Sequence, residues 1–215
     1  MALVRTGGTV LRATSTPSFA SDAPGNVRHE ELRLELCETL RRMAAGGLVL
    51  GAAGNVSTRA GELVVVSPSR RWYDTLGPAD VCLVEPDGKL VEGPAPSVEL
   101  PMHLAVLAAR PEVGAVVHTH SPYATALSCV LDEIPVVEPE QDETVGGPLP
   151  VAGPAPSGTA ALGEAVLAAA GDLSAAVVRG HGPVCFGRDL AGALACAFAV
   201  EENARIFALV QLLKP

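Results

Sequence analysis

Three of the five histidines in this chain stand where apolar segments end. Residues 113–117 are rich in valine and predict a buried strand, which is followed by His118 and His120. Successive side chains of a strand point to opposite faces, so these two imidazoles should project to the same side. His181 follows a second apolar run and lies between two glycines. Neutral imidazoles bind borderline cations such as Zn²⁺, and the three are therefore candidate metal ligands.

The pair alone also has a simpler interpretation. Two solvated polar side chains at the junction of a strand and a loop would account for His118 and His120 equally well. The imidazole of His181, at an independent strand end, favours a three-histidine metal site over this alternative.

An acidic residue stands near the start of a predicted helix. Ser97 is a good N-cap, and Glu99 then falls in the first turn, where the helix dipole favours a negative charge. A first-turn carboxylate often has only this electrostatic role. His103, one turn further along, is predicted to be an ordinary, partly buried imidazole.

Two further segments have residue types suited to an anion. Gly54 and Asn55, in a loop of small residues, can adopt crowded or left-handed backbone conformations that direct N–H groups at a ligand. A tight connection between strands explains this loop without any ligand. Ser69 and Arg70 follow a predicted strand, and arginine pairs with phosphate or carboxylate through two hydrogen bonds. Surface solvation explains the arginine as well.

Apolar periodicity predicts that helices and strands are interspersed along the chain. The pair Asp87-Gly88 between two apolar runs is typical of a tight hairpin, so part of the sheet should be antiparallel. Residues 134–147 are acidic and are predicted to be irregular. The predicted helices span 29–45, 97–110, 121–131, 158–170 and 189–213, and the predicted strands span 63–66, 81–84, 89–91, 113–117, 149–151 and 175–178.

Composition limits the class of protein. The chain has 215 residues, of which 48% are hydrophobic, enough for one sizeable core. A net charge of −9 argues against nucleic acid or an anionic membrane as the main partner. No apolar stretch is clean enough to span a bilayer. The cysteines are odd in number and scattered, which predicts free thiols and a cytoplasmic location: Cys37, Cys82, Cys129, Cys185 and Cys196.

The amino-terminal segment differs from the rest. Residues 1–28 are rich in Gly, Ser, Thr and Pro and contain no unbroken apolar run, which argues against a secretory signal. We expect a disordered or weakly ordered extension, followed by one domain over residues 29–215. A transit peptide is the alternative, because arginines and hydroxyl residues occur together with few acidic ones.

Five short motifs, in this order, resemble those of the metal-dependent class II aldolase and adducin head-domain family. The resemblance covers roughly residues 29–213 and is carried by the order of the motifs more than by any one of them. The motifs are Gly54-Asn55-Val56-Ser57, Ser67-Pro68-Ser69, Ser97-Val98-Glu99, residues 117–122 (VHTHSP) and Gly180-His181-Gly182.

The resemblance implies a three-layer α/β/α fold with a mostly antiparallel central sheet. It also implies a homotetramer with active sites between subunits, a small and anionic substrate, and a resident Zn²⁺, with Mn²⁺, Co²⁺ or Fe²⁺ as other possibilities. It assigns His118, His120 and His181 to the metal, and Glu99 both to the metal and to acid–base catalysis. The family's phosphate contacts fall on Gly54, Asn55, Ser69 and Ser97, with Arg70 included by position.

The implied function is that of a lyase. It would cleave or form a C–C bond of a small hydroxy-ketone or sugar phosphate through a metal-bound enediolate. A decarboxylase or a dehydratase on the same scaffold is the alternative, and a non-catalytic module like the adducin head is disfavoured by the retained metal ligands. The chain departs from the family's aldolases at Arg70, where they carry Gly, and at Val98, where a second Ser is common. It departs again at Glu138-Pro139, where they carry a His-Tyr pair, and it lacks their aromatic tail.

Overall fold

The computed structural model describes residues 27–214, and nearly all of the extension predicted for residues 1–28 lies outside this range. A single nine-stranded sheet crosses the molecule in the order β4-β3-β2-β1-β5-β9-β8-β7-β6, and β7 with β8 forms its only parallel pair among the described residues. The strands are β1 (Asn55–Ala60), β2 (Leu63–Val66), β3 (Cys82–Val84), β4 (Leu90–Glu92), β5 (Ala115–His118), β6 (Glu133–Ile134), β7 (Leu149–Ala152), β8 (Ala175–Val178) and β9 (Gly182–Gly187).

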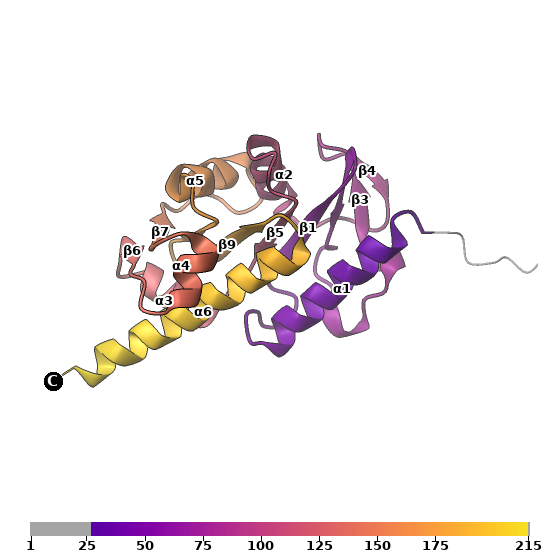
Figure 1. Cartoon of the computed structure of the whole chain (residues 1–215). Coiled ribbons are helices and arrows are strands. Elements are labelled where there is room, and N and C mark those ends of the chain that lie inside the picture. The colour runs from indigo at the N-terminus through magenta and orange to yellow at the C-terminus, as the bar shows by residue number, and fades with distance from the viewer. Residues whose placement is uncertain (1–26, 215) are drawn as a thin grey trace, which may run out of the picture.

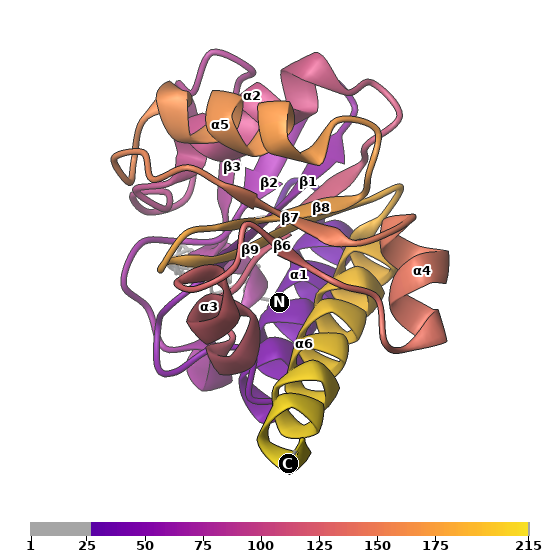
Figure 2. The same cartoon turned by 90° about the vertical axis from the view of Figure 1, so that its left-hand side faces the viewer.

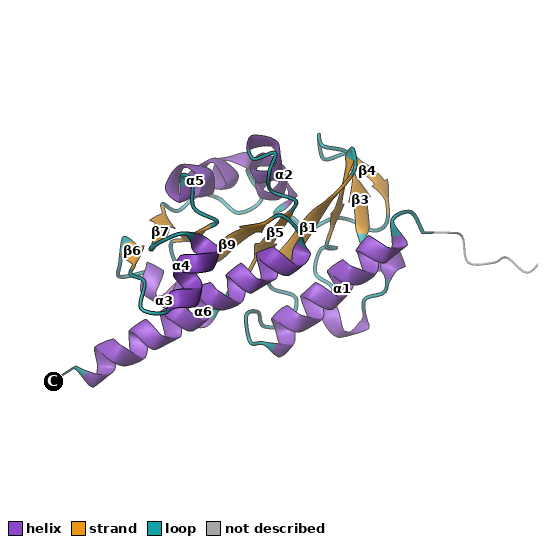
Figure 3. Ribbon diagram, viewed as in Figure 1, coloured by secondary structure: helices purple, strands orange, loops and turns teal. Residues whose placement is uncertain are grey.

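Helices cover both faces of the sheet, which confirms the three-layer α/β/α prediction (Figures 1, 2 and 3). Helices α2 and α5 pack on one face, and the other four pack on the opposite face. The helices are α1 (Glu30–Ala45), α2 (Leu100–Ala109), α3 (Pro122–Ser128), α4 (Pro139–Val145), α5 (Ala160–Ala170) and α6 (Leu190–Leu213), with short 3-10 turns at Tyr73–Thr75 and Pro78–Asp80.

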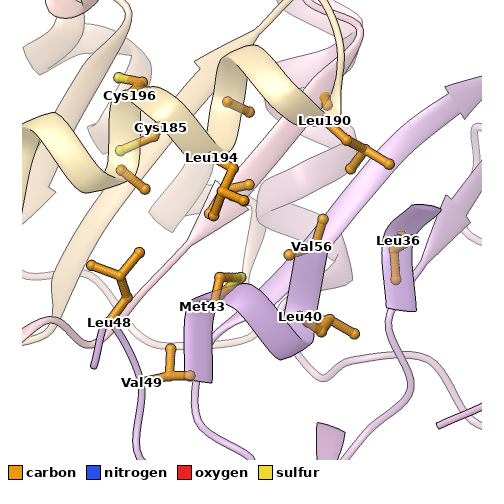
Figure 4. Close-up of a cluster of buried hydrophobic side chains, with 14 of the residues drawn as sticks. Leu36, Leu40, Met43, Leu48, Val49, Val56, Cys185, Leu190, Leu194 and Cys196 are labelled. Atoms are coloured by element: carbon orange, nitrogen blue, oxygen red, sulfur yellow. The ribbon is translucent and has the colours of Figure 1, made fainter. Parts of the chain in front are cut away.

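Each face of the sheet has its own apolar core. Leu36, Leu40 and Met43 of α1 are fully buried against the sheet and α6 (Figure 4). Burying one such side chain stabilises the fold by about 1.5–3 kcal/mol. On the other face, Met102 and Val106 of α2 pack with the apolar side of α5.

The alternation of side chains along β5 determines on which face of the sheet His118 lies. Val117 belongs to the core under α1 and α6, whereas Val116 belongs to the core under α2 and α5. Because side chains alternate, His118 falls on the same face as Val116, beneath the start of α2. The strand prediction for residues 113–117 therefore has the right periodicity, although β5 itself begins at Ala115.

Two central strands were not predicted. β1 contains mostly small and polar residues, since Asn55 and Ser57 face α2 instead of the apolar core. β9 contains a glycine at each end and Pro183, which are uncommon inside strands. Both strands are buried by neighbours on either side, so tertiary pairing overrides their weak local preference.

The structure corrects three predictions: one segment predicted to be irregular contains a helix, and two predicted helices have different bounds. The acidic segment 134–147 contains α4, which Pro139 begins and Gly146, in a left-handed conformation, ends. Asn203 of α6 anchors the approach to α4 by accepting hydrogen bonds from the N–H groups of Val137 and Glu138. Helix α3 ends at Ser128 and not at residue 131. Helix α2 begins at Leu100, with Glu99 and not Ser97 at its N-cap position.

Candidate metal centre and active site

The structure brings together the four side chains that the resemblance assigned to a metal. Glu99 precedes α2, His118 is the last residue of β5, His120 lies two residues further on, and His181 lies in the turn between β8 and β9. Their nearest nitrogen and oxygen atoms all lie within 4.8 Å of one another. The predicted convergence of segments far apart in the chain is therefore seen in the geometry.

A glycine allows two of these segments to meet. β5 pairs with β9 in antiparallel register, and the N–H of Thr119 donates to the carbonyl of Pro183 at 3.0 Å. A Cβ atom on Gly182 would lie 2.0 Å from the carbonyl oxygen of Thr119, and Gly182 has a φ of 155°. Only glycine fits here, so the Gly-His-Gly spacing is what brings His181 next to the end of β5.

The orientation of His118 leaves one nitrogen for a ligand. Its Nδ1 lies 2.9 Å from the carbonyl oxygen of Pro183, so this nitrogen carries the proton and donates it. The buried Nε2 then presents a lone pair and has no hydrogen-bond partner within residues 27–214. It faces Oε2 of Glu99 at 3.2 Å. A lone pair that faces a carboxylate oxygen in a buried site fits a cation bound between them.

Distances within the cluster suit a tetrahedral ion. A tetrahedron with metal bonds of ~2.1 Å has edges of ~3.4 Å. Each carboxylate oxygen of Glu99 lies at about this distance from a different imidazole: Oε2 is 3.2 Å from Nε2 of His118, and Oε1 is 3.5 Å from Nε2 of His181, so either oxygen could be the fourth ligand. The imidazole centroids are 4.8 to 5.0 Å apart, with interplanar angles of 64° to 83°. Three nitrogens and one carboxylate oxygen form a ligand set that zinc accepts.

The protonation states also suit metal binding. Removal from water, followed by the neighbouring His118 and His181, lowers the pKa of His120 to about 4. Burial and His118 lower the pKa of His181 as well. Both imidazoles are therefore neutral at pH 7, as a ligand must be. Burial by itself would raise the pKa of Glu99, but the facing imidazole of His118 when it is protonated, together with hydrogen bonds from Asn55 and Ser157, lowers it overall.

The carboxylate of Glu99 is held by side chains from two other segments. Asn55 Nδ2 donates to Oε2 at 2.9 Å, and the hydroxyl of Ser157 donates to Oε1 at 2.7 Å. The helix dipole invoked from the sequence has a smaller part, because no N–H of α2 bonds to this carboxylate among the described contacts. Ser157 was missed by sequence reasoning, since a lone serine in a loop of Pro and Gly has no distinguishing pattern.

A pocket of about 170 Å³ opens beside the cluster. It contains the residues predicted to contact substrate, and Arg70 is the only lysine or arginine among the described residues that line it. Arg70 has a φ of 55°, a left-handed conformation that glycine adopts at lower cost. The lining residues are Ala52, Ala53, Gly54, Asn55, Pro68, Ser69, Arg70, Ser97, Val98, Glu99, His120, Ser157 and His181.

Neither tyrosine of the chain lines this pocket. Tyr73 is buried, and its hydroxyl bonds to the carbonyl oxygens of Ala53 and Gly54 at 2.9 and 2.6 Å. Tyr123 lies at the start of α3. The pocket of one chain therefore has no phenolic acid within residues 27–214.

The chain belongs to the class II aldolase and adducin family, since the model of the Class II Aldolase and Adducin N-terminal domain matches residues 34–208. It is 36% identical over 173 residues to the 5-methylthioribulose-1-phosphate/5-deoxyribulose-1-phosphate aldolase of Rhodospirillum rubrum, covering 80% of this chain and 78% of that protein. It is 31% identical over 181 residues to the L-fuculose phosphate aldolase of Escherichia coli strain K12, covering 84% of each.

Solved structures agree with this assignment. An L-fuculose 1-phosphate aldolase superposes with a TM-score of 0.81 at 26% identity, covering 86% of this chain and 88% of the other. The L-fuculose-1-phosphate aldolase from Thermus thermophilus superposes with a TM-score of 0.76 at 29% identity, covering 85% and 98%. The predictions of fold and of a class II aldolase-family lyase are thereby confirmed. Within residues 27–214, no helix is both long and apolar enough to cross a membrane.

Proposed function

We propose that this protein is a metal-dependent aldolase that cleaves or forms the C3–C4 bond of a ketose 1-phosphate. The observation that carries the proposal is an ionised, buried Glu99 whose two carboxylate oxygens each face a different imidazole of a three-histidine cluster. The curated relatives are named for ketose 1-phosphates and support the substrate class.

We assign His118, His120 and His181 to the metal, with Glu99 as a further ligand in the absence of substrate. A bound divalent cation would supply a Lewis acid for the negative charge that develops on substrate oxygens. We propose zinc as the ion. Mn²⁺, Co²⁺ and Fe²⁺ suit the same donors, and their availability would decide among them.

Glu99 is the proposed acid and base. Its lowered pKa keeps the resting carboxylate ionised, the form that can accept a proton from the hydroxymethyl carbon of dihydroxyacetone phosphate in the direction of bond formation. The electron pair left on that carbon then attacks the aldehyde carbon, and the aldehyde oxygen takes up a proton. In cleavage the C4 hydroxyl loses its proton, the C3–C4 electron pair moves onto C3, and the carboxyl of Glu99 returns a proton to C3.

The pocket wall supports phosphate recognition. The N–H groups of Gly54, Arg70 and Val98 have no acceptor within the described residues, which leaves them free for an anion. The hydroxyls of Ser69 and Ser97 and the guanidinium of Arg70 are the proposed side-chain donors.

Asn55 is the remaining predicted substrate contact, and only part of its amide group is available for that contact. One amide hydrogen already bonds to Glu99, and the amide oxygen lies 2.5 Å from His103 Nε2. Its second amide hydrogen is the group we assign to substrate.

The missing phenol favours a second candidate. Aldehyde release requires a group that takes the proton of the C4 hydroxyl and, in bond formation, returns it as an acid to the aldehyde oxygen; neither Tyr73 nor Tyr123 lines the pocket. Loss of carbon dioxide requires no such acid, so a decarboxylase acting on a small hydroxy or oxo acid is the alternative. Arg70 would then bind the second anionic group of that substrate. A dehydratase on the same scaffold is a weaker variant of this candidate.

We further propose that the protein is a homotetramer in the cytoplasm. A neighbouring subunit could then supply the acid that the pocket of one chain lacks. The free cysteines of the described chain support a reducing compartment.

Deuterium exchange tests the proposal without knowledge of the aldehyde. The metal content of the purified protein is measured first, and dihydroxyacetone phosphate is then incubated with it in D₂O and followed by proton NMR. We expect about one divalent ion per chain and exchange of one hydroxymethyl hydrogen. Exchange should stop in Glu99→Gln, in which the three histidines still retain the metal. Unchanged exchange in this variant would contradict the role of Glu99.

A substrate screen separates the two candidate reactions. L-fuculose 1-phosphate, 5-deoxyribulose 1-phosphate and 5-methylthioribulose 1-phosphate are compared with unphosphorylated ketoses and with hydroxy and oxo acids. Aldehyde release from a ketose 1-phosphate supports the aldolase. Carbon dioxide release without aldehyde supports the decarboxylase and would rule out the first proposal.

A further inference from the structure

His103 is a fully buried histidine whose ring, among the described contacts, has no hydrogen bond to the side chains of the candidate metal cluster. It lies on α2, one turn after Glu99, and its side chain faces β1. Nδ1 lies 2.7 Å from the hydroxyl of Ser57, and Nε2 lies 2.5 Å from Oδ1 of Asn55. The same amide donates to Glu99 Oε2 at 2.9 Å. Both ring nitrogens are therefore bonded, and through Asn55 the ring is one residue away from the carboxylate.

Ser57, His103, Asn55 and Glu99 form a hydrogen-bonded row in that order. The chemistry of these groups determines the direction of each hydrogen bond. An ionised carboxylate only accepts, so the amide nitrogen of Asn55 must face Glu99. The amide oxygen then faces His103 and requires a proton on Nε2. Complete burial disfavours the charged ring, so Nδ1 carries no proton and accepts a hydrogen bond from the hydroxyl of Ser57. The imidazole is neutral and has a single permitted tautomer.

Helix and strand geometry explain why the row exists. Glu99 and His103 are four residues apart at the start of α2 and lie on the same side of the helix. Asn55 and Ser57 are two residues apart on β1 and lie on the same face of the sheet. The two pairs interlock, and the hydrogen-bonded row joins α2 to the central strand that pairs with β5.

We propose that His103 is a positioning residue: it holds the amide of Asn55 in the one orientation that donates to Glu99, and Ser57 fixes the tautomer that allows this. Without the Nε2–H donor, the amide oxygen of Asn55 would be buried without a partner, and the amide could rotate its oxygen toward the carboxylate. The carboxylate of Glu99 would then no longer be held in its position beside the imidazole cluster and substrate. The effect on catalysis rests on the proposed function, whereas the tautomer does not.

Two variants separate positioning from packing. His103→Leu fills the space but removes both ring nitrogens, whereas His103→Gln retains an N–H donor near the position of Nε2. We expect His103→Leu to exchange dihydroxyacetone phosphate about 10- to 100-fold more slowly at saturation, as misplacement of a catalytic group does. Half-saturation and metal content should be unchanged, and His103→Gln should recover most of the rate.

Several outcomes would overturn the inference. One is exchange in His103→Leu as fast as in wild type, and another is equal impairment of the Leu and Gln variants, which would indicate packing alone. If His103→Leu does not fold, Ser57→Ala decides, since it removes one oxygen atom. This variant loses the hydrogen bond from Ser57 to His103, which supports Glu99 only indirectly. We therefore expect its saturated rate to fall about 3- to 10-fold. An unchanged rate would contradict the proposal.

A spectroscopic measurement separates this inference from the proposed function. ¹⁵N NMR shifts of the His103 ring in the metal-free protein distinguish its two tautomers. The Nε2–H form is expected, and the Nδ1–H form or an imidazolium would refute the row as described. If wild type exchanges no dihydroxyacetone phosphate, the proposed function fails, and the NMR result still decides whether His103 orients Asn55.

Discussion

Asn55 and His118 are direct partners in the antiparallel pairing of β1 with β5, and both approach the same oxygen of Glu99. The amide nitrogen of Asn55 lies 2.9 Å from Oε2, and Nε2 of His118 lies 3.2 Å from it. The register of one strand pair therefore places a hydrogen-bond donor and a proposed metal ligand side by side. A slip of one residue would turn either side chain to the opposite face of the sheet.

Replacing Gly182 should damage both the fold and the metal centre. In Gly182→Ala the added Cβ would overlap the carbonyl oxygen of Thr119, which is backbone and cannot move aside without disturbing β5. We expect a loss of about 2 kcal/mol or more in unfolding free energy and weaker metal binding, measured by urea unfolding and metal titration. Gly153→Ala is the control, because nothing lies within 4 Å of its Cβ position. Equal effects of the two changes would contradict this account.

Removing the charge at position 70 should affect substrate affinity without harming stability. Arg70→Ala takes away the guanidinium that lines the pocket and leaves the backbone N–H in place. A lost charge-assisted hydrogen bond to phosphate is worth about 1.5–3 kcal/mol, so KM should rise at least about 10-fold while kcat changes less. Arg71→Ala removes an equal charge from the adjacent residue, which does not line the pocket, and should leave KM nearly unchanged. A matching rise in KM would indicate a general charge effect.

A carboxylate of α6 should stabilise the segment that follows the histidine pair. Glu201 accepts hydrogen bonds from the N–H groups of Tyr123 and Ala124, at 2.9 and 3.0 Å, at the start of α3. Glu201→Ala leaves these donors unpaired and should lower the unfolding free energy by about 1–3 kcal/mol. Glu202→Ala, which breaks only an exposed pair with Arg205, should cost less than about 1 kcal/mol. Urea unfolding of both variants checks the difference.

Acid should destabilise the metal-free protein partly through His103. Burial, followed by the charge of His118, lowers the pKa of His103 from 6.5 to about 3. Below pH 6.5 the unfolded chain binds a proton that the folded chain does not, so the stabilising contribution is complete above pH 6.5 and is lost as the pH falls toward 3. The loss is about 1.4 kcal/mol per pH unit.

Unfolding in urea at pH 7 and pH 5 measures this contribution. Between these values His103→Gln should lose about 2 kcal/mol less stability than wild type. His120 and His181 shift in the same direction but are common to both proteins. Parallel pH dependences would show that His103 does not remain neutral.

The sequence predicted the convergence of the histidines better than the surroundings of their cluster. His118, His120 and His181 occupy strand ends and occur in a fixed motif order, so their convergence follows from local pattern and resemblance. The support of Glu99 by Asn55 and Ser157 depends on how α2 docks on β1 and on the course of the loop before α5. No local signal encodes that docking.

His103 shows the same limit most clearly. It was predicted as an ordinary, partly buried imidazole, because one histidine in an apolar helix has no distinguishing pattern. The structure shows it fully buried and bonded at both nitrogens. Its partners lie on β1, a strand that was not predicted because its residues are mostly small and polar.

The four groups of the proposed metal centre come from the start of α2, the end of β5 and the turn between β8 and β9. A chain that has assembled only part of its sheet therefore has an incomplete set of these groups and cannot bind a cation tightly. Ion capture would come last during maturation, and local opening of the β8–β9 hairpin would be enough to release the ion.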